Sequence, residues 1–96
     1  MYILVTYDVE TKDPAGQKRL RKVANCCKDF GQRVQSSVFE CEVTPADLIN
    51  LKYQLKSLID TRTDSIRIYH LGNNYRTKIE RIGIETSIDI AGTLIV

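Results

Sequence analysis

Apolar residues recur along the chain with two different periods, and each period predicts one kind of secondary structure. Residues 2–7 are almost uniformly apolar, β-branched or aromatic, which is typical of a strand covered on both faces. Residues 33–43 alternate with a period of two, so that Phe39 and Cys41 share one face. A third apolar, β-branched segment spans residues 65–71. We therefore expect three strands, with the first at the centre of a sheet.

Between these strands lie two segments in which apolar residues have helical spacing. In the first, Asp13 and Pro14 suit the N-cap and the first helical position, and Gly31 is a suitable stop. In the second, Thr44 and Asp47 form a capping-box-like start. The predicted apolar stripes are Leu20, Val23, Ala24, Cys27 and Phe30 in the first segment, and Leu48, Leu51, Leu55, Leu58 and Ile59 in the second.

The order of these elements predicts an α+β fold. Strand, helix, strand, helix, strand within a single domain of residues 1–96 suggests the ferredoxin-like arrangement, in which both helices cover one face of an antiparallel sheet. Two helices cannot cover both faces of a strand as apolar as residues 2–7, so we expect a homodimer in which a second copy covers the other face. After a turn at residues 72–74, a weaker strand is predicted near residues 78–82, and residues 93–96 could add an edge strand across the dimer.

Composition places the chain among ordinary globular proteins. Its 96 residues are 43% hydrophobic and 27% charged, which fits one domain. No apolar run reaches the roughly 18 residues that cross a bilayer, so no membrane association is expected. Cys26, Cys27 and Cys41 lack the CxxC spacing of zinc sites, and we interpret them as reduced, buried residues, with a reactive thiol as the alternative. These features predict a cytoplasmic protein.

Charge is unevenly distributed, although the net charge is only +2. Residues 12–33 carry seven bases and two acids, a net charge of +5, and the rest of the chain carries −3. This asymmetry is a candidate surface for a polyanion such as nucleic acid. The candidate phosphate-binding residues are Arg19, Arg21, Lys22 and Arg33, since arginine suits bidentate contact with phosphate. A solvated helix face is the alternative interpretation of the same charges.

Asp8 is the first candidate for chemistry, because it follows the first predicted strand directly. A two-fold axis near the strand ends would bring two Asp8 side chains together, and Mg²⁺ requires only one or two carboxylates with water and substrate phosphate. Such a metal polarises a phosphodiester and lowers the pKa of bound water, so that no histidine is needed. The alternative is an aspartate that caps the following loop.

The remaining candidates carry weaker signals. The only histidine, His70, lies within the third strand, which gives little support to a histidine-based nuclease and favours a structural histidine. Tyr7 could shape a pocket and Ser37 could hydrogen-bond phosphate, although structural roles compete for both. Phe39 is expected in the core or at an interface. The sequence has no aromatic stacking pattern or base-reading motif, which indicates backbone binding with little sequence preference.

Four short motifs occur in a characteristic order along the chain. They are YDV at residues 7–9, RLRKVA at residues 19–24, GQRVQSSVFE at residues 31–40 and RIYHLG at residues 67–72. In order and spacing they resemble the CRISPR-associated Cas2 family, small proteins of the spacer-acquisition machinery, over nearly the whole chain. The resemblance implies a ferredoxin-like homodimer, which agrees with the fold that the pattern predicts.

The resemblance also implies partners and site residues. Family members assist the CRISPR integrase in inserting new spacers, and their dimer forms a central bridge along which duplex DNA lies. They have also been assigned metal-dependent endonuclease activity on single-stranded RNA or double-stranded DNA, with Mg²⁺ held by the strand-end aspartate, a position that Asp8 matches. Arg33 and Phe39 match the family's basic and aromatic site positions, and Arg19 or Arg21 matches the arginines of its first helix.

Three functions remain open at this point. The first is an Mg²⁺-dependent phosphodiesterase in which paired Asp8 residues hold the metal. The second is a non-catalytic dimeric adaptor that bridges DNA and the CRISPR integrase. The third, a small-molecule-sensing domain, requires a glycine-rich loop before the first helix, where Gly16 is the only glycine, and it ranks last. Hydrolysis needs the Asp8 carboxylate, whereas bridging needs mainly the basic surface and the dimer.

Overall fold

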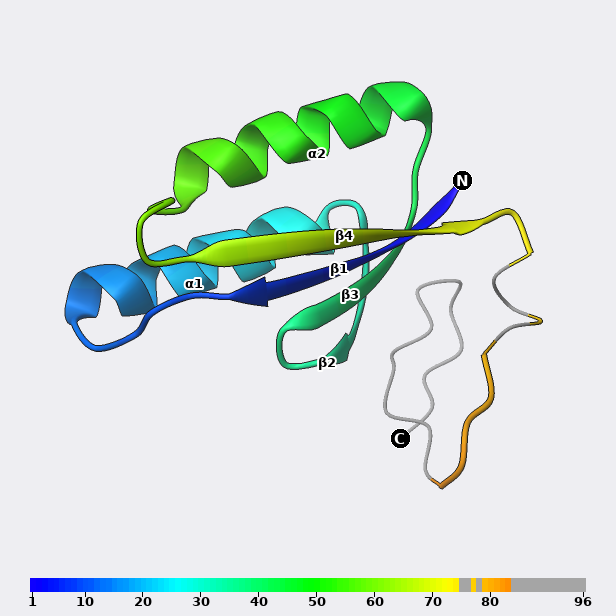
Figure 1. Cartoon of the computed structure of the whole chain (residues 1–96), viewed down its shortest axis with the longest axis horizontal. Helices are drawn as coiled ribbons and strands as arrows, with labels where there is room; N and C mark the ends of the chain where they lie inside the picture. The colour runs from blue at the N-terminus through cyan, green and yellow to red at the C-terminus, as the bar shows by residue number, and fades with distance from the viewer. Residues whose placement is uncertain (75–76, 78, 84–96) are drawn as a thin grey trace.

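The strands and helices follow the predicted order as far as β4, except that the second predicted strand is a pair of strands. The computed structural model describes residues 1–74, 77 and 79–83. The elements are β1 (Tyr2–Asp8), α1 (Pro14–Lys28), β2 (Gly31–Gln35), β3 (Val38–Glu42), α2 (Pro45–Leu58) and β4 (Ser65–Gly72). The strands form one antiparallel sheet in the order β2-β3-β1-β4, and both helices lie against one of its faces (Figure 1). This confirms the ferredoxin-like α+β fold, with β1 in the interior of the sheet.

The segment predicted as one strand over residues 33–43 is a hairpin of two strands. β2 and β3 pair antiparallel with Gln35 opposite Val38, so that Ser36 and Ser37 form the turn. The prediction of a single strand was wrong because the period-two pattern runs across the turn without a glycine or asparagine to mark it. The predicted face is nevertheless confirmed, since the side chain of Phe39 is fully buried.

Helix α1 begins where the sequence predicts and ends earlier. Asp13 is the N-cap, and its side chain accepts a hydrogen bond from the backbone N–H of Gly16 at 2.8 Å. The helix ends at Lys28, and Gly31, predicted as its stop, is instead the first residue of β2. Glycine at this position has a packing reason, because a Cβ would overlap the carbonyl oxygen of Glu40 on β3.

Helix α2 begins with the predicted capping box. The Thr44 hydroxyl accepts a hydrogen bond from the Asp47 backbone N–H at 3.1 Å, and the Asp47 carboxylate accepts one from the Thr44 backbone N–H at 3.1 Å. These bonds satisfy N–H groups that a helix start leaves without partners. Leu48, Leu51 and Leu55 are buried, which confirms the apolar stripe along this helix.

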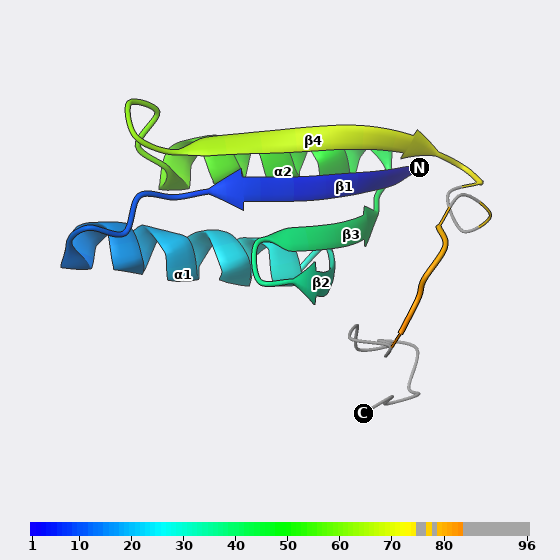
Figure 2. The ribbon, with the colours of Figure 1, turned by 60° about the horizontal axis from the view of Figure 1, so that its bottom comes forward.

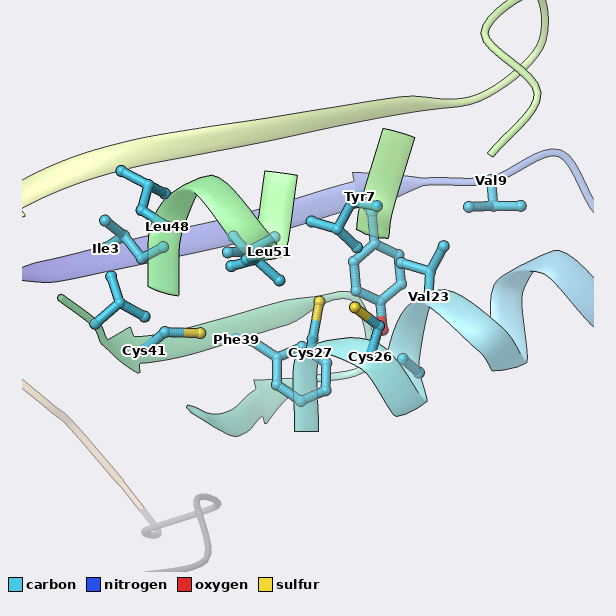
Figure 3. Packing of buried hydrophobic residues seen from close by; sticks show 14 residues of the cluster. Ile3, Tyr7, Val9, Val23, Cys26, Cys27, Phe39, Cys41, Leu48 and Leu51 are labelled. Atoms are coloured by element: carbon cyan, nitrogen blue, oxygen red, sulfur yellow. The ribbon is translucent and has the colours of Figure 1, made fainter. Parts of the chain in front are cut away.

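The core lies between the sheet and the two helices, and Figure 3 shows the Tyr7 ring pointing from β1 toward α1. Its buried hydrophobic residues are Ile3, Val5, Tyr7, Val9, Val23, Ala24, Cys26, Cys27, Phe39, Cys41, Val43, Leu48, Leu51 and Leu55. All three cysteines belong to this core and are free. Burial raises the pKa of Cys27 to about 12 and that of Cys41 to about 11. The cysteines are therefore buried thiols, as predicted, and a reactive thiolate is disfavoured.

Two predictions concern the chain after β4. Residues 79–82 are not in a strand, so the weaker strand predicted near residues 78–82 is wrong for these positions. The edge strand predicted at residues 93–96 lies outside the described residues. Within the described part of the chain, neither helix has the length and apolar character needed to cross a membrane.

Candidate metal and nucleic-acid site

Asp8 lies on the open face of the sheet, opposite the helices. Side chains alternate along β1, so that Val5 and Tyr7 are buried against the helices and Thr6 and Asp8 lie on the other face. Asp8 is the last residue of β1 and is exposed. Among the described residues, no hydrogen bond or ion pair involves its carboxylate. The lone pairs of this carboxylate are therefore available to a ligand.

A shallow hollow of about 270 Å³ surrounds Asp8. It is lined by Thr6, Tyr7, Asp8, Ser65, Arg67 and Tyr69. Strands β1 and β4 build it, because Asp8 pairs with Ser65 and Thr6 pairs with Arg67 across the two strands. The Arg67 guanidinium donates a hydrogen bond to the Tyr69 hydroxyl at 3.4 Å. The hollow thus gathers a carboxylate, hydroxyls and a guanidinium, groups that suit a cation and a phosphate.

A second aspartate, Asp64, lies at the same end of the sheet with its side chain fully buried. One carboxylate oxygen accepts hydrogen bonds from the Glu10 backbone N–H and the Thr63 hydroxyl, both at 3.0 Å. The other accepts from Arg19 Nε at 2.8 Å and from the Asp60 backbone N–H at 2.9 Å. Burial by itself would raise the pKa of Asp64, but these hydrogen bonds outweigh it and lower the pKa to about 2. Asp64 is therefore a charged carboxylate, and all four of its hydrogen-bond donors belong to the protein itself.

The basic candidates of α1 are placed differently from one another. The Arg19 side chain is 23% exposed and forms the ion pair with Asp64. Arg21 and Lys22 are exposed on α1, which lies in the layer behind the sheet, away from the open face that carries Asp8 (Figure 2). The fold does not gather these three residues into one patch with Asp8. Their role in binding nucleic acid stays a prediction.

Tyr7, Phe39 and Arg33 form a second cluster, on the helix-facing side of the sheet. The ring centroids of Tyr7 and Phe39 are 6.2 Å apart, and the Arg33 guanidinium carbon lies 5.2 Å from the Phe39 centroid. The Tyr7 hydroxyl donates to the Ser36 carbonyl at 3.1 Å, and the Ser37 carbonyl accepts from the Tyr7 backbone N–H at 3.1 Å. Burial raises the pKa of Tyr7, although the nearby Arg33 guanidinium opposes this. These contacts of Tyr7 stabilise the packing of the β2–β3 hairpin against β1.

Comparison with known proteins identifies the family. A family model described as CRISPR associated protein Cas2 matches residues 1–79. The chain belongs to the Cas2 family. The CRISPR-associated endonuclease Cas2 of Halalkalibacterium halodurans is 58% identical over 95 residues, which are 99% of each chain. The CRISPR-associated endoribonuclease Cas2 of Nitratidesulfovibrio vulgaris is 50% identical over 95 residues, which are 99% of this chain and 93% of that one.

Solved structures of Cas2 proteins have the same fold. The crystal structure of Streptococcus pyogenes Cas2 at pH 6.5 aligns with a TM-score of 0.79 at 58% identity, and the match covers 86% of this chain and 100% of that chain. A structure titled "Crystal structure of cas2" aligns with a TM-score of 0.70 at 31% identity and covers 90% of each chain. The family resemblance of the four sequence motifs is thereby confirmed.

For a Cas2 protein, the donors around Asp8 can be tested against the needs of Mg²⁺. Oxygen donors suit this ion, and Asp8 offers a free carboxylate beside the hydroxyls of Thr6 and Ser65. The described part of the chain has no group of three or more His, Cys, Asp and Glu side chains that could hold a metal. One chain thus supplies one carboxylate, which fits a site completed by water, phosphate or a second Asp8.

Several residues of this Cas2 chain that shape the site were not predicted from sequence: Thr6, Ser65, Arg67 and Tyr69 of the hollow, and Asp64 beside it. Ser65 and Arg67 could have been found from the alternation of β4. Ile66 and Ile68 face the core, so Ser65 and Arg67 lie on the open face. Asp64 carried no such signal. Its partners belong to a loop, a helix and a turn that meet only in the folded chain.

Proposed function

We propose that this Cas2 family member is an Mg²⁺-dependent endonuclease that hydrolyses phosphodiester bonds in RNA or double-stranded DNA. The observation that carries the proposal is the setting of Asp8, an exposed carboxylate with no described partner in a hollow shared with Ser65 and Arg67. The endonuclease and endoribonuclease names of the relatives support the same activity.

In this proposal each group of the hollow has a defined task. Asp8 holds Mg²⁺, which when bound polarises the phosphodiester and lowers the pKa of water. Arg67 binds non-bridging phosphate oxygens, because a guanidinium suits this geometry and Tyr69 already orients it. The hydroxyls of Thr6 and Ser65 hydrogen-bond water or phosphate. His70 has no part, since it does not line the hollow.

The open face also supports a homodimer. Leu4 and Val38 are only half buried there, and Tyr69 is 45% exposed. A two-fold dimer through this face would cover these side chains and bring the two Asp8 residues toward each other. Both protomers would then contribute to one metal site. Within the cell, we expect this dimer to act with the CRISPR integrase during spacer insertion.

A non-catalytic adaptor is the second candidate function, and a specific observation favours it. The exposed bases Arg21 and Lys22 lie on α1, on the layer opposite Asp8. A duplex bound along that helix would not reach the hollow of the same protomer. In this role the dimer would bridge DNA and the integrase, and Asp8 would be dispensable.

Cleavage of labelled single-stranded RNA and duplex DNA separates the two candidates. Wild type, Asp8→Asn and Glu42→Gln are compared with Mg²⁺ or with EDTA, after light scattering has established that all are dimers. Glu42 is a matched control, because it is an exposed carboxylate that pairs with Tyr2 at the other end of β1. The nuclease loses cleavage in EDTA and in Asp8→Asn but not in Glu42→Gln. Cleavage that is absent in wild type, or unchanged in Asp8→Asn, while spacer acquisition survives the substitution would establish the adaptor instead.

A further inference from the structure

Three segments meet at the end of the sheet that carries Asp8. They are the loop after β1, the first turns of α1 and the turn between α2 and β4, and both views of the ribbon place them together (Figures 1 and 2). Asp64 lies at their meeting point. Its carboxylate binds the Glu10 backbone N–H in the loop, Arg19 on α1 and the Asp60 backbone N–H in the turn. One buried carboxylate therefore ties all three segments together.

These contacts fix the backbone that follows Asp8 and the neighbouring strand at the residue opposite Asp8. Glu10, whose N–H donates to Asp64 at 3.0 Å, is two residues after Asp8. Ser65, which follows Asp64 directly, is the cross-strand partner of Asp8 in β4. Asp8 itself has no described partner, so the position of its carboxylate depends on this backbone. A displacement of about 1 Å at a catalytic group is enough to cost activity.

Gly16 packs against the same loop. A Cβ at this position would overlap the carbonyl oxygen of Glu10 and would lie 3.2 Å from the Cα of Thr11. The first turn of α1 thus packs directly on the Glu10 residue whose N–H is bound by Asp64. The Asp13 side chain caps the helix by accepting a hydrogen bond from the Gly16 N–H, and this bond holds Gly16 in position.

We propose that Asp64 and Arg19 are positioning residues that hold the Asp8 carboxylate in place for metal binding, with Arg19 acting through Asp64 and not on the nucleic-acid phosphate. The inference rests on the proposed function, since it concerns the same metal. Arg19 is the base of α1 whose guanidinium Nε is occupied by a buried carboxylate at 2.8 Å. Its loss would therefore impair a site that it does not touch.

Two substitutions disturb the pair in different ways. Asp64→Asn replaces an acceptor of four hydrogen bonds with an amide that is itself a donor, so that Glu10 or Arg19 loses its partner. Arg19→Lys keeps the positive charge that a phosphate contact needs but lacks the guanidinium Nε–H that donates to Asp64. Leu48→Ala is the control for stability alone, because Leu48 is buried in the first turn of α2 and lies beside Ile3, away from the Asp8 end of β1 (Figure 3).

The test is a titration of the nitrogen-15-labelled dimer with Mg²⁺ alone, without nucleic acid, followed by the amide signals of residues 7–10. It is run where thermal melts show every variant to be folded. Wild type is expected to bind Mg²⁺ and Asp8→Asn to lose binding. Asp64→Asn and Arg19→Lys are expected to raise the Kd by about tenfold or more, and Leu48→Ala to leave it unchanged.

Several outcomes would overturn the inference. An unchanged Kd for Mg²⁺ in Asp64→Asn refutes the positioning role. If Leu48→Ala raises the Kd as much as Asp64→Asn does, the effect is due to lower stability and the positioning role is refuted. Unchanged Mg²⁺ binding in Arg19→Lys, with weaker RNA or DNA binding, makes Arg19 a phosphate contact. If Asp64→Asn does not fold, Gly16→Ala displaces the same loop and must weaken binding likewise. Absence of Mg²⁺ binding in wild type, or full binding in Asp8→Asn, instead refutes the proposed function. Both of these proteins keep the Asp64–Arg19 pair, so this result is distinct from a failure of the positioning role.

Discussion

Two aspartates lie at the same end of the sheet in opposite circumstances. Asp64 is buried with a donor on every side, from Glu10, Arg19, Asp60 and Thr63. Asp8 is exposed on the open face and has no partner among the described residues. The two are joined through the backbone, because Asp8 pairs with the residue that follows Asp64.

The comparison shows how the surroundings of a carboxylate indicate its role. Asp64 has its lone pairs filled by the protein, which stabilises the charge in the interior and leaves nothing for a ligand. Asp8 has unfilled lone pairs in a polar hollow, so that a cation can bind without displacing a protein contact. We therefore expect substitutions at Asp64 to alter stability as well as metal binding, and substitutions at Asp8 to alter function alone.

The largest expected effect concerns the open face. Asp8→Asn should lower the single-turnover cleavage rate by about 1,000-fold, because loss of the metal removes several kcal/mol of transition-state stabilisation. The melting temperature should not fall, since no described contact is lost. Rates are measured with saturating Mg²⁺, beside thermal melts of the same samples. Activity within tenfold of wild type would contradict the assignment of Asp8 as the metal ligand.

The next largest effect is expected for the buried aspartate, Asp64. Asp64→Asn should lower the free energy of unfolding by about 3 kcal/mol, because buried donors lose a charged acceptor. Urea titration measures this loss. Asp60→Asn is the control, since Asp60 pairs with an 86% exposed Arg62 side chain and little change is expected there. Equal effects of the two substitutions would mean that burial does not distinguish Asp64.

The sequence was sufficient for the local parts of this comparison. The apolar run of residues 2–7 predicts a strand that ends at Asp8, and the N-cap at Asp13 locates the start of α1. Both signals lie within a few residues of the feature that they predict. The position of Asp8 at a strand end could therefore be predicted before the fold was known, whereas the face on which its side chain lies could not.

Long-range contacts explain what the sequence did not reveal. Arg19 and Asp64 are far apart in the chain, so the pattern assigned Arg19 to a solvated or phosphate-binding face of the helix. The hairpin was missed for a different reason, because Ser36 and Ser37 turn the chain without glycine. The first error is due to tertiary packing, and the second is due to a local turn that the residue types do not mark.

A smaller effect is expected from pH, through the buried carboxylate of Asp64. Its pKa is lowered from 3.8 to about 2, so the ionised side chain stabilises the fold above about pH 4, and this contribution is lost as the pH falls toward 2. The stability lost over this range should be about 2 kcal/mol, a value that allows for screening by solvent around the partly exposed Arg19. Urea midpoints between these pH values should fall in wild type more steeply than in Asp64→Asn. Parallel profiles would show that other carboxylates dominate acid unfolding.

The smallest effect extends the comparison from the two aspartates to two arginines. Arg33 lies 5.2 Å from the centroid of the buried Phe39 ring, on the helix-facing side of the sheet, whereas Arg67 lines the hollow around Asp8. Arg33→Gln should cost about 0.5–1 kcal/mol of stability, the size of a cation–π contact near the surface, and should leave the cleavage rate near that of wild type. Arg67→Gln should do the reverse, because its guanidinium contacts only the Tyr69 hydroxyl among the described hydrogen bonds but faces the proposed phosphate position. Urea titrations and single-turnover rates on both variants decide the matter. If Arg33→Gln lowers the rate as much as Arg67→Gln does, phosphate binding extends beyond the open face, and the division of the sheet into a structural and a functional side is wrong.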